Sequence, residues 1–213
     1  MVQIAPSMLA ADFLHLEKDV EMVNANADLF HLDIMDGLFV PNISYGFPVV
    51  EAIARMARKP LDAHLMIVEP EKYVERFVKA GSSMVSFHLN ATNDPDAVLA
   101  KIRGCGAKAG LVINPDIPVE SLFPHLKNCD YVMLMSVYAG FGGQKFIEDT
   151  YDRVKALRAE LDAQGLDIPL EVDGGVSASN AAELIRSGAD ILVAGSAVFK
   201  AEDPADVIAR MRG

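Results

Sequence analysis

Eight short apolar segments recur along this chain, and their spacing restricts its fold more than any other feature. The segments are residues 3–6, 29–34, 60–67, 83–89, 107–113, 130–137, 168–174 and 190–196. Most are almost continuously apolar, which is typical of strands that are covered on both faces. Their starts are mostly about 20–40 residues apart, which leaves room for a helix after each strand.

The segments between these strands have helical periodicity and polar faces. Examples are residues 13–26, 70–81, 150–165 and 179–188. Gly81 and Gly188 stand where helices should end, and Asp203-Pro204 opens the last helix. No linker or low-complexity tract divides the chain. We therefore expect a single-domain α/β protein, a (β/α)8 TIM barrel over residues 1–213. The competing fold is a doubly wound open sheet, which the lack of a G-x-G-x-x-G turn disfavours.

The charge balance excludes several classes of partner. The chain carries 30 acidic and 19 basic residues and a formal net charge of −11. We therefore expect no nucleic-acid partner and no membrane partner. No apolar run is as long as a membrane span, and the start of the chain does not resemble a signal peptide. Cys105 and Cys129 form no CxxC pair, so we expect a cytoplasmic protein without disulfides.

Polar residues gather at the carboxyl ends of the expected strands, where barrels of this kind place their chemistry. They are Ser7, His31, Asp33, His64, His88, Asn114, Ser136, Asp173 and Gly195-Ser196. By contrast Asp62, Lys108 and Asp130 fall at strand starts, where we expect only salt bridges.

Two imidazoles and two carboxylates of this set should converge on one barrel mouth. His31 and Asp33 are two residues apart on a strand, so their side chains point to the same face. His64 comes from the neighbouring strand and Asp173 from across the barrel. Taken singly, each residue is explained as well by a hydrogen-bonded core histidine or a helix-capping aspartate. Together they predict a mixed N/O site for a divalent ion such as Zn, Fe(II), Mn or Co.

Glycine-rich turns after the last three strands are suited to phosphate. They are AGFGGQ (139–144), DGGVSASN (173–180) and AGSAVF (194–199). Glycine lets the backbone approach an anion closely and direct its N–H groups toward it. Phe141 is interpreted either as the apolar tip of a mobile lid or as an aromatic packed on the rim. Met8, Met35, Met66 and Met135 either line the mouth or fill the core.

These segments together resemble a known family. IAPSML, HLDIMDGLFVPN, PLDAHLM, LMSVYAGFGGQKFI, EVDGGV and VAGSAVF are similar, in the same order, to motifs of the ribulose-phosphate 3-epimerase family. The resemblance covers essentially the whole chain. It implies a TIM barrel of the ribulose-phosphate-binding type and a metal-dependent isomerase of the pentose phosphate pathway. It also implies a phosphorylated ketose substrate and a homo-oligomer, either a dimer or a hexamer.

The resemblance also assigns roles to residues. It makes His31, Asp33, His64 and Asp173 the ligands of one divalent ion, and it makes Asp33 and Asp173 the two acid/base groups. The implied substrate and phosphate contacts are Ser7, His64, Gly140, Phe141, Gly142, Gly143, Asp173, Gly174, Gly175, Gly195 and Ser196. A base on each face of the substrate allows a proton to be removed at C3 and one to be returned on the opposite face. The metal would stabilise the enediolate charge between these steps.

Two departures from the family pattern affect substrate detail. Tyr138-Ala139 stands where the family usually has Asn-Pro, and Asn90 stands where an acidic residue is more usual. The near relative D-allulose-6-phosphate 3-epimerase, acting on a six-carbon ketose phosphate, therefore stays an alternative. A Schiff-base aldolase or a phosphate-binding synthase is disfavoured, because Lys108 and Lys145 are badly placed for it. A non-catalytic sugar-phosphate binder is disfavoured, because all four metal ligands are present.

Overall fold

Each predicted apolar segment contains one β-strand. The computed structural model describes residues 1–213. The strands are β1 (Gln3–Pro6), β2 (Phe30–Met35), β3 (Leu61–Met66), β4 (Met84–His88), β5 (Lys108–Ile113), β6 (Tyr131–Met135), β7 (Leu170–Asp173) and β8 (Ile191–Ala194). They form one eight-stranded sheet whose neighbouring strands are parallel.

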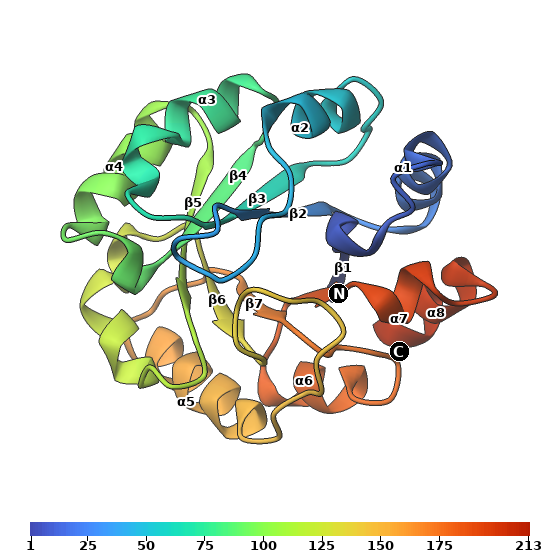
Figure 1. Ribbon diagram of the computed structural model, residues 1–213. Coiled ribbons are helices and arrows are strands. Elements are labelled where there is room, and N and C mark those ends of the chain that lie inside the picture. Colours follow the sequence, from blue (N-terminus) through green and yellow to red (C-terminus); the bar gives the residue numbers. More distant parts are fainter.

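The sheet curls into a barrel whose first and second strands meet at the seam. Strand order is β1-β8-β7-β6-β5-β4-β3-β2, so β1 and β2 are its two edges. A parallel bridge joins Ser7 to His31 across these edges, and the Asp28 amide donates to the Ile4 carbonyl over 3.0 Å. The fold prediction of a (β/α)8 barrel is therefore confirmed (Figure 1).

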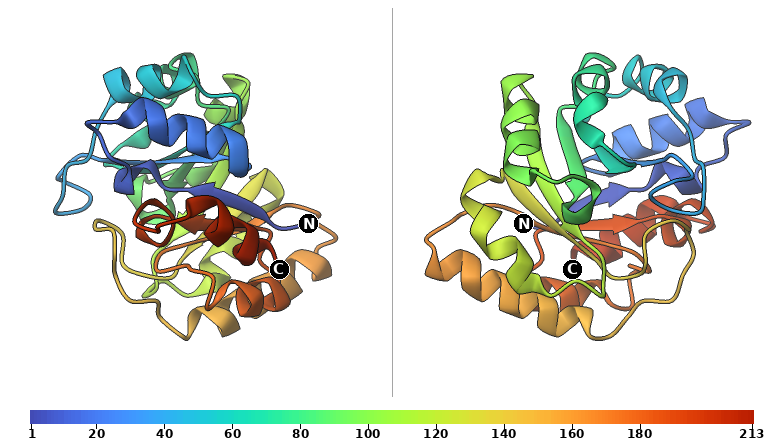
Figure 2. Two further views of the ribbon diagram at one scale, coloured as in Figure 1. Left: turned by 90° about the vertical axis from the view of Figure 1, so that its right-hand side faces the viewer. Right: turned by 60° about the vertical axis from the view of Figure 1, so that its left-hand side comes forward.

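Helices surround the barrel in the order that the periodicity predicts. They are α1 (Leu16–Asn26), α2 (Phe47–Ala54), α3 (Val74–Lys79), α4 (Pro95–Gly104), α5 (Thr150–Ala163), α6 (Ala181–Ser187), α7 (Ser196–Phe199) and α8 (Pro204–Arg212) (Figure 2). Short 3₁₀ segments cover Met8–Ala10, Pro70–Lys72 and Leu89–Ala91. The Asp203 carboxylate accepts from the Asp206 amide over 3.1 Å and so caps α8, which begins where the sequence predicts. No helix is both long and apolar enough to span a membrane.

One connection departs from the regular pattern. Between β5 and β6 the chain forms a 3₁₀ segment, Val119–Asn128, in place of an α-helix. Pro124 lies inside this segment, and proline has no N–H to donate to an α-helical hydrogen bond.

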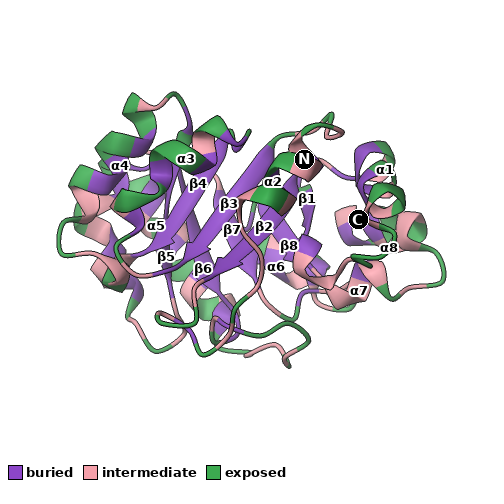
Figure 3. Cartoon of the chain, turned by 45° about the horizontal axis from the view of Figure 1, so that its top comes forward, coloured by how far each residue is buried: buried purple, intermediate pink, exposed green.

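The strands are buried along most of their length (Figure 3). A cluster of 47 buried residues fills the space between the strands and the surrounding helices. A smaller cluster of six residues lies apart from it: Ala5, Leu29, Met84, Tyr131, Ile191 and Val193. Buried polar side chains, among them His31, Asp62, His64 and Glu171, come from the same strands. The strands thus hold their charged groups on a rigid support.

Candidate metal centre and active site

The four predicted ligands come together at the mouth of the barrel. His31 and Asp33 share one face of β2, and Asp33 pairs in register with His64 of β3. Asp173 is the last residue of β7. Asp33 Oδ1 lies 3.3 Å from His64 Nδ1 and 3.5 Å from His31 Nε2. Asp173 Oδ2 lies 3.7 Å from His64 Nδ1 and 3.8 Å from His31 Nε2.

This group fits a metal ion by its spacing and by its chemistry. One donor atom from each of the four residues lies within 4.8 Å of the others. Ligands about 2.0–2.1 Å from one tetrahedral ion are roughly 3.3–3.5 Å apart, which is close to the spacing found here. His31 is fully buried, and its Nε2 atom has no hydrogen-bond partner although it faces the two carboxylates. An ion at this point would satisfy that atom.

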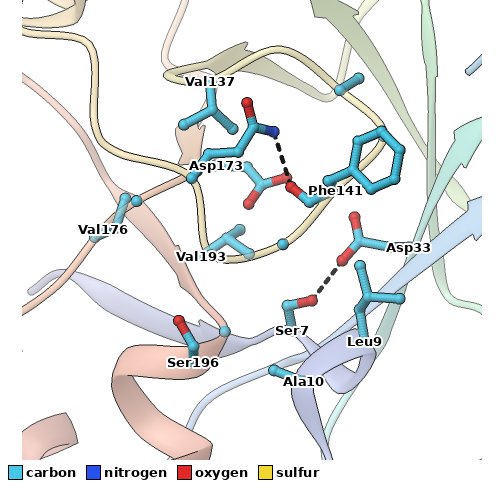
Figure 4. Close-up of a pocket in the computed structure, with 18 of the residues that line it drawn as sticks. Ser7, Leu9, Ala10, Asp33, Val137, Phe141, Asp173, Val176, Val193 and Ser196 are labelled. Atoms are coloured by element: carbon cyan, nitrogen blue, oxygen red, sulfur yellow. Dashed lines mark hydrogen bonds between the residues drawn. The ribbon is translucent and has the colours of Figure 1, made fainter. Parts of the chain in front are cut away.

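The two carboxylates of the site differ in their surroundings. Burial would raise the pKa of Asp33, but the charge of the nearby His31 and the hydrogen bond from His64 lower it well below its usual range. The Ser7 hydroxyl also donates to Asp33 Oδ2 (Figure 4). The Asp173 side chain accepts no hydrogen bond, and burial together with the charge of Asp33 raises its pKa to about 6.

A second layer of polar groups contacts the outer nitrogens of the two histidines. His31 Nδ1 lies 2.8 Å from Asp62 Oδ2 and 3.4 Å from Glu171 Oε1. The Tyr131 hydroxyl donates to Asp62 Oδ1 over 2.6 Å. Sequence reasoning assigned no role at the site to these three residues. The two-residue period of a strand could have indicated two of them. Asp62 precedes His64 by two residues and Glu171 precedes Asp173 by two, so each pair points to the same face of its strand.

The other histidine ligand has a different outer neighbour. His64 Nε2 lies 2.9 Å from His88 Nε2, and the two rings are stacked with centroids 5.0 Å apart. Burial and the charge of His64 lower the pKa of His88 well below its usual range, so His88 is neutral. His88 was singled out as a strand-end residue, and the structure places it behind a ligand, where it does not face the cavity.

Most of the predicted substrate contacts line one cavity of about 760 Å³ above the metal ligands (Figure 4). Ten of them border it: Ser7, Gly140, Phe141, Gly142, Gly143, Asp173, Gly174, Gly175, Gly195 and Ser196. Asp33 borders it too, whereas His64 is fully buried and does not. Met35, Met66 and Met135 line the cavity as well, but Met8 belongs to the outer core. Lys200 also borders the cavity, and sequence reasoning did not single it out.

The loop after β6 is fastened to its neighbours over the cavity. The Asn42 amide donates to the Gly140 carbonyl over 2.7 Å, and Gln144 Nε2 donates to the carbonyls of Tyr138 and Phe141. In Figure 1 this loop and the loop after β2 lie in front of the strands. Phe141 borders the cavity and is 54% exposed.

Gly175 shows why a phosphate-type turn is confined to glycine here. Its φ is +62°, and a Cβ atom would lie 2.7 Å from the Phe146 amide nitrogen. Any side chain would therefore be strained and would push away the base of the loop after β6.

The structure tests several expectations about neighbouring charges. Asp36 lies outside this cluster and accepts hydrogen bonds from the amides of Leu38, Phe39 and Val68, so it braces two loops. Asp130 pairs with Arg103 over 2.9 Å, as expected for a strand start.

The other two strand-start expectations fail, one wholly and one in part. Lys108 is exposed and forms no ion pair. Asp62 pairs with His31 over 2.8 Å, but it is fully buried, because its position two residues before His64 turns it to the inside of the barrel.

Sequence comparisons identify close relatives of this chain. The ribulose-phosphate 3 epimerase family matches residues 3–199. Ribulose-phosphate 3-epimerase of Synechocystis sp. is 47% identical over 99% of this chain and 93% of its own length. The enzymes of that name from Mycobacterium tuberculosis and Bacillus subtilis are 44% and 42% identical, over 98% and 100% of this chain and 91% and 99% of their own lengths.

Solved structures of other enzymes share the fold at low identity. 3-Hexulose-6-phosphate synthase from Salmonella typhimurium superposes with a TM-score of 0.74 at 16% identity, covering 99% of this chain and 96% of its own. KGPDC from Streptococcus mutans also gives 0.74, at 13% identity, over 100% and 96% of the two chains. These likenesses concern the barrel alone. The near full-length sequence matches establish that the chain belongs to the ribulose-phosphate 3-epimerase family.

Proposed function

We propose that this protein is a metal-dependent isomerase that interconverts D-ribulose 5-phosphate and D-xylulose 5-phosphate in the pentose phosphate pathway. The observation that carries the proposal is the pair Asp33 and Asp173, which reach one cavity from opposite strands beside two histidines. The relatives at 42–47% identity, which bear the name ribulose-phosphate 3-epimerase, support the same substrate.

In this proposal His31, Asp33, His64 and Asp173 hold one divalent ion. When bound, the ion supplies a Lewis acid that stabilises negative charge developing on the substrate oxygens. Mixed imidazole and carboxylate ligands suit Zn, Fe(II), Mn and Co, and we propose an ion from this group.

Asp33 and Asp173 exchange protons with C3 of the substrate from its two faces. One carboxylate takes the C3 proton, and the electron pair of that bond passes toward the neighbouring ketone. The other carboxylic acid then returns a proton to C3 on the opposite face, so the configuration is inverted. The raised pKa of Asp173, about 6, and the lowered pKa of Asp33 leave one proton on the pair below about pH 6 in the metal-free protein.

The remaining contacts position the substrate. Ser7 keeps Asp33 oriented through its hydrogen bond. We propose that the glycine turns at Gly140–Gly143, Gly174-Gly175 and Gly195-Ser196 bind the phosphate through backbone N–H groups, and that Phe141 covers the bound substrate. This explains how a chain with a net charge of −11 holds an anion.

The test is an assay of metal-stripped and reconstituted protein on two substrates. Chelation should abolish turnover, and Mn²⁺, Fe²⁺, Co²⁺ or Zn²⁺ should restore it. We expect kcat/KM for D-ribulose 5-phosphate to exceed that for D-allulose 6-phosphate by about tenfold or more. The reverse preference would assign the chain to the six-carbon substrate, and activity that survives complete metal removal would refute the metal site.

We further propose that residues 1–213 form a single domain in a cytoplasmic homo-oligomer, a dimer or a hexamer. Pairing of β1 with β8 ties the two ends of the chain into one sheet, and both cysteines are free thiols. The exposed apolar side chains of Phe13, Leu14, Leu38 and Ile43 support self-association. Light scattering coupled to size exclusion measures the assembly directly, and a monomer at micromolar concentration would contradict it.

A further inference from the structure

A chain of buried hydrogen bonds runs beneath the metal site from one side of the barrel to the other. His31 of β2 contacts Asp62 of β3 over 2.8 Å, and Asp62 accepts from the Tyr131 hydroxyl of β6 over 2.6 Å. All three side chains are fully buried. None of them borders the cavity, so the chain is separate from the substrate contacts described above.

Asp62 restricts which nitrogen of His31 carries a proton. An ionised carboxylate only accepts hydrogen bonds, so the nearby Nδ1 atom of His31 must be the donor. In the neutral ring the lone pair then lies on Nε2. This is the buried nitrogen without a partner, and it faces Asp33 and Asp173 at 3.5 and 3.8 Å. Asp62 therefore presents the correct nitrogen of His31 to an ion.

Asp62 is itself held in one orientation. Its backbone pairs in register with His31, so the two side chains are neighbours on the inner face. The Tyr131 ring reaches Asp62 across the barrel because residue 110 is glycine. A Cβ atom at Gly110 would lie 2.4 Å from Tyr131 Cζ. Such a short contact is not tolerated, and the sequence leaves this space to the tyrosine.

The other groups near the two histidines do not fix a tautomer in this way. Glu171 is 3.4 Å from His31 Nδ1, and neither of its carboxylate oxygens has a hydrogen-bond partner. His64 Nε2 faces the Nε2 atom of His88, which can donate or accept. Of the outer carboxylates, Asp62 makes the one hydrogen bond to a proposed ligand histidine, at 2.8 Å.

We propose that Asp62, braced by Tyr131, is a positioning residue that fixes the tautomer and orientation of His31 for a divalent ion. The inference rests on the metal site proposed above and adds Asp62 to it as a residue that supports the ligand His31. Outer partners of metal-binding histidines typically change metal affinity by about 10–100-fold when removed. The contact between Asp62 and His31 is short and buried, and Tyr131 braces it from the far side of the barrel. We therefore expect its loss to reduce metal affinity within that range.

The test measures the Zn²⁺ dissociation constant of the metal-free full-length protein by competition with a chromophoric chelator. We expect about 10-fold weaker binding for Asp62→Asn and about 100-fold for Asp62→Leu, which has no acceptor. Tyr131→Phe keeps the ring and should weaken binding about threefold to tenfold. The matched control is Glu171→Gln, which removes a carboxylate near the same nitrogen and should change affinity less than threefold.

Two further readouts separate positioning from loss of structure. Denaturant unfolding of each metal-free variant shows whether that variant folds. If an Asp62 variant does not fold, the Zn²⁺ affinity of Tyr131→Phe still tests the inference. Nitrogen NMR of the zinc-loaded wild type should show a protonated Nδ1 on His31. Unchanged affinity in folded Asp62→Leu, or an equal loss in Glu171→Gln, would overturn the inference. Failure of the wild type to bind Zn²⁺ would instead overturn the metal site itself.

Discussion

The two sides of the site hold their carboxylates in opposite ways. On the β2–β3 side, Asp33 accepts a hydrogen bond from the Ser7 hydroxyl and lies against two imidazoles, which lower its pKa. On the β7 side, Asp173 is 9% exposed, accepts no side-chain hydrogen bond and has its pKa raised to about 6. Two aspartates of one cluster thus differ in pKa because of their neighbours, a difference that suits the proposed roles of acid and base.

Removing either carboxylate is the strongest test of the difference between Asp33 and Asp173. We expect Asp33→Asn and Asp173→Asn each to lower kcat about 10³-fold, because each deprives one face of the substrate of its proton acceptor or donor. Binding of inorganic phosphate should survive in both, because the glycine turns are untouched. The measurement is steady-state turnover at saturating metal together with calorimetric titration of phosphate.

Asp130→Asn is the control for these two substitutions. Asp130 is an aspartate at the start of a strand and pairs with Arg103, far from the ligand group. Its replacement should leave kcat unchanged. A fully active Asp173→Asn variant would rule out the two-base assignment.

The stability of the metal-free protein should show the unusual pKa of Asp173. A carboxyl whose pKa is near 6 in the folded state and 3.8 in the unfolded state binds more protons when folded between these values. Its contribution to the free energy of unfolding therefore falls as pH rises from about 4 to 6 and stays low above that. We expect Asp173→Asn to stabilise the metal-free protein at pH 7 by about 1–3 kcal/mol and to have little effect at pH 4.

Urea unfolding at both pH values, with a chelator present, measures this difference. Asp33→Asn should change the free energy of unfolding in the opposite direction. The pKa of Asp33 is lowered in the folded state, so its ionised form stabilises the folded protein above pH 4. That variant should be destabilised at pH 7. Equal effects of the two substitutions would remove the distinction between the two sides.

The convergence of the four proposed ligands could be predicted because the relevant patterns are local. His31 and Asp33 share a strand face by the two-residue period, and strand ends of a barrel meet at one mouth. The apolar segments predicted all eight strands to within about two residues at most ends, because buried parallel strands have a continuous apolar pattern.

The supporting residue Asp62 was missed although the same two-residue period places it on the inner face of its strand. Asp62 was assigned to the stabilising end of its strand, yet the inside of the barrel is continuous, and the residue two before a ligand lies directly beneath it. For Met8 the sequence left the mouth and the core equally open, and the structure places it in the outer core, because the chain turns into a 3₁₀ segment at that residue. Which of the two applies depends on packing between segments distant in sequence, which a one-dimensional pattern does not contain.

Ser7→Ala should have the smallest effect and sharpen the comparison most. It removes the hydroxyl that donates to Asp33 and leaves the metal ligands and the glycine turns in place. Loss of a hydrogen bond to an ionised group raises the pKa of that group, so Asp33 should become more like Asp173. We expect kcat/KM to fall about tenfold or less and its acid limb to move to higher pH. Ser177→Ala is the matched control, because Ser177 borders the same cavity but its hydroxyl contacts Ser179. If the two variants had the same pH profile, the low pKa of Asp33 would be due to the two imidazoles alone.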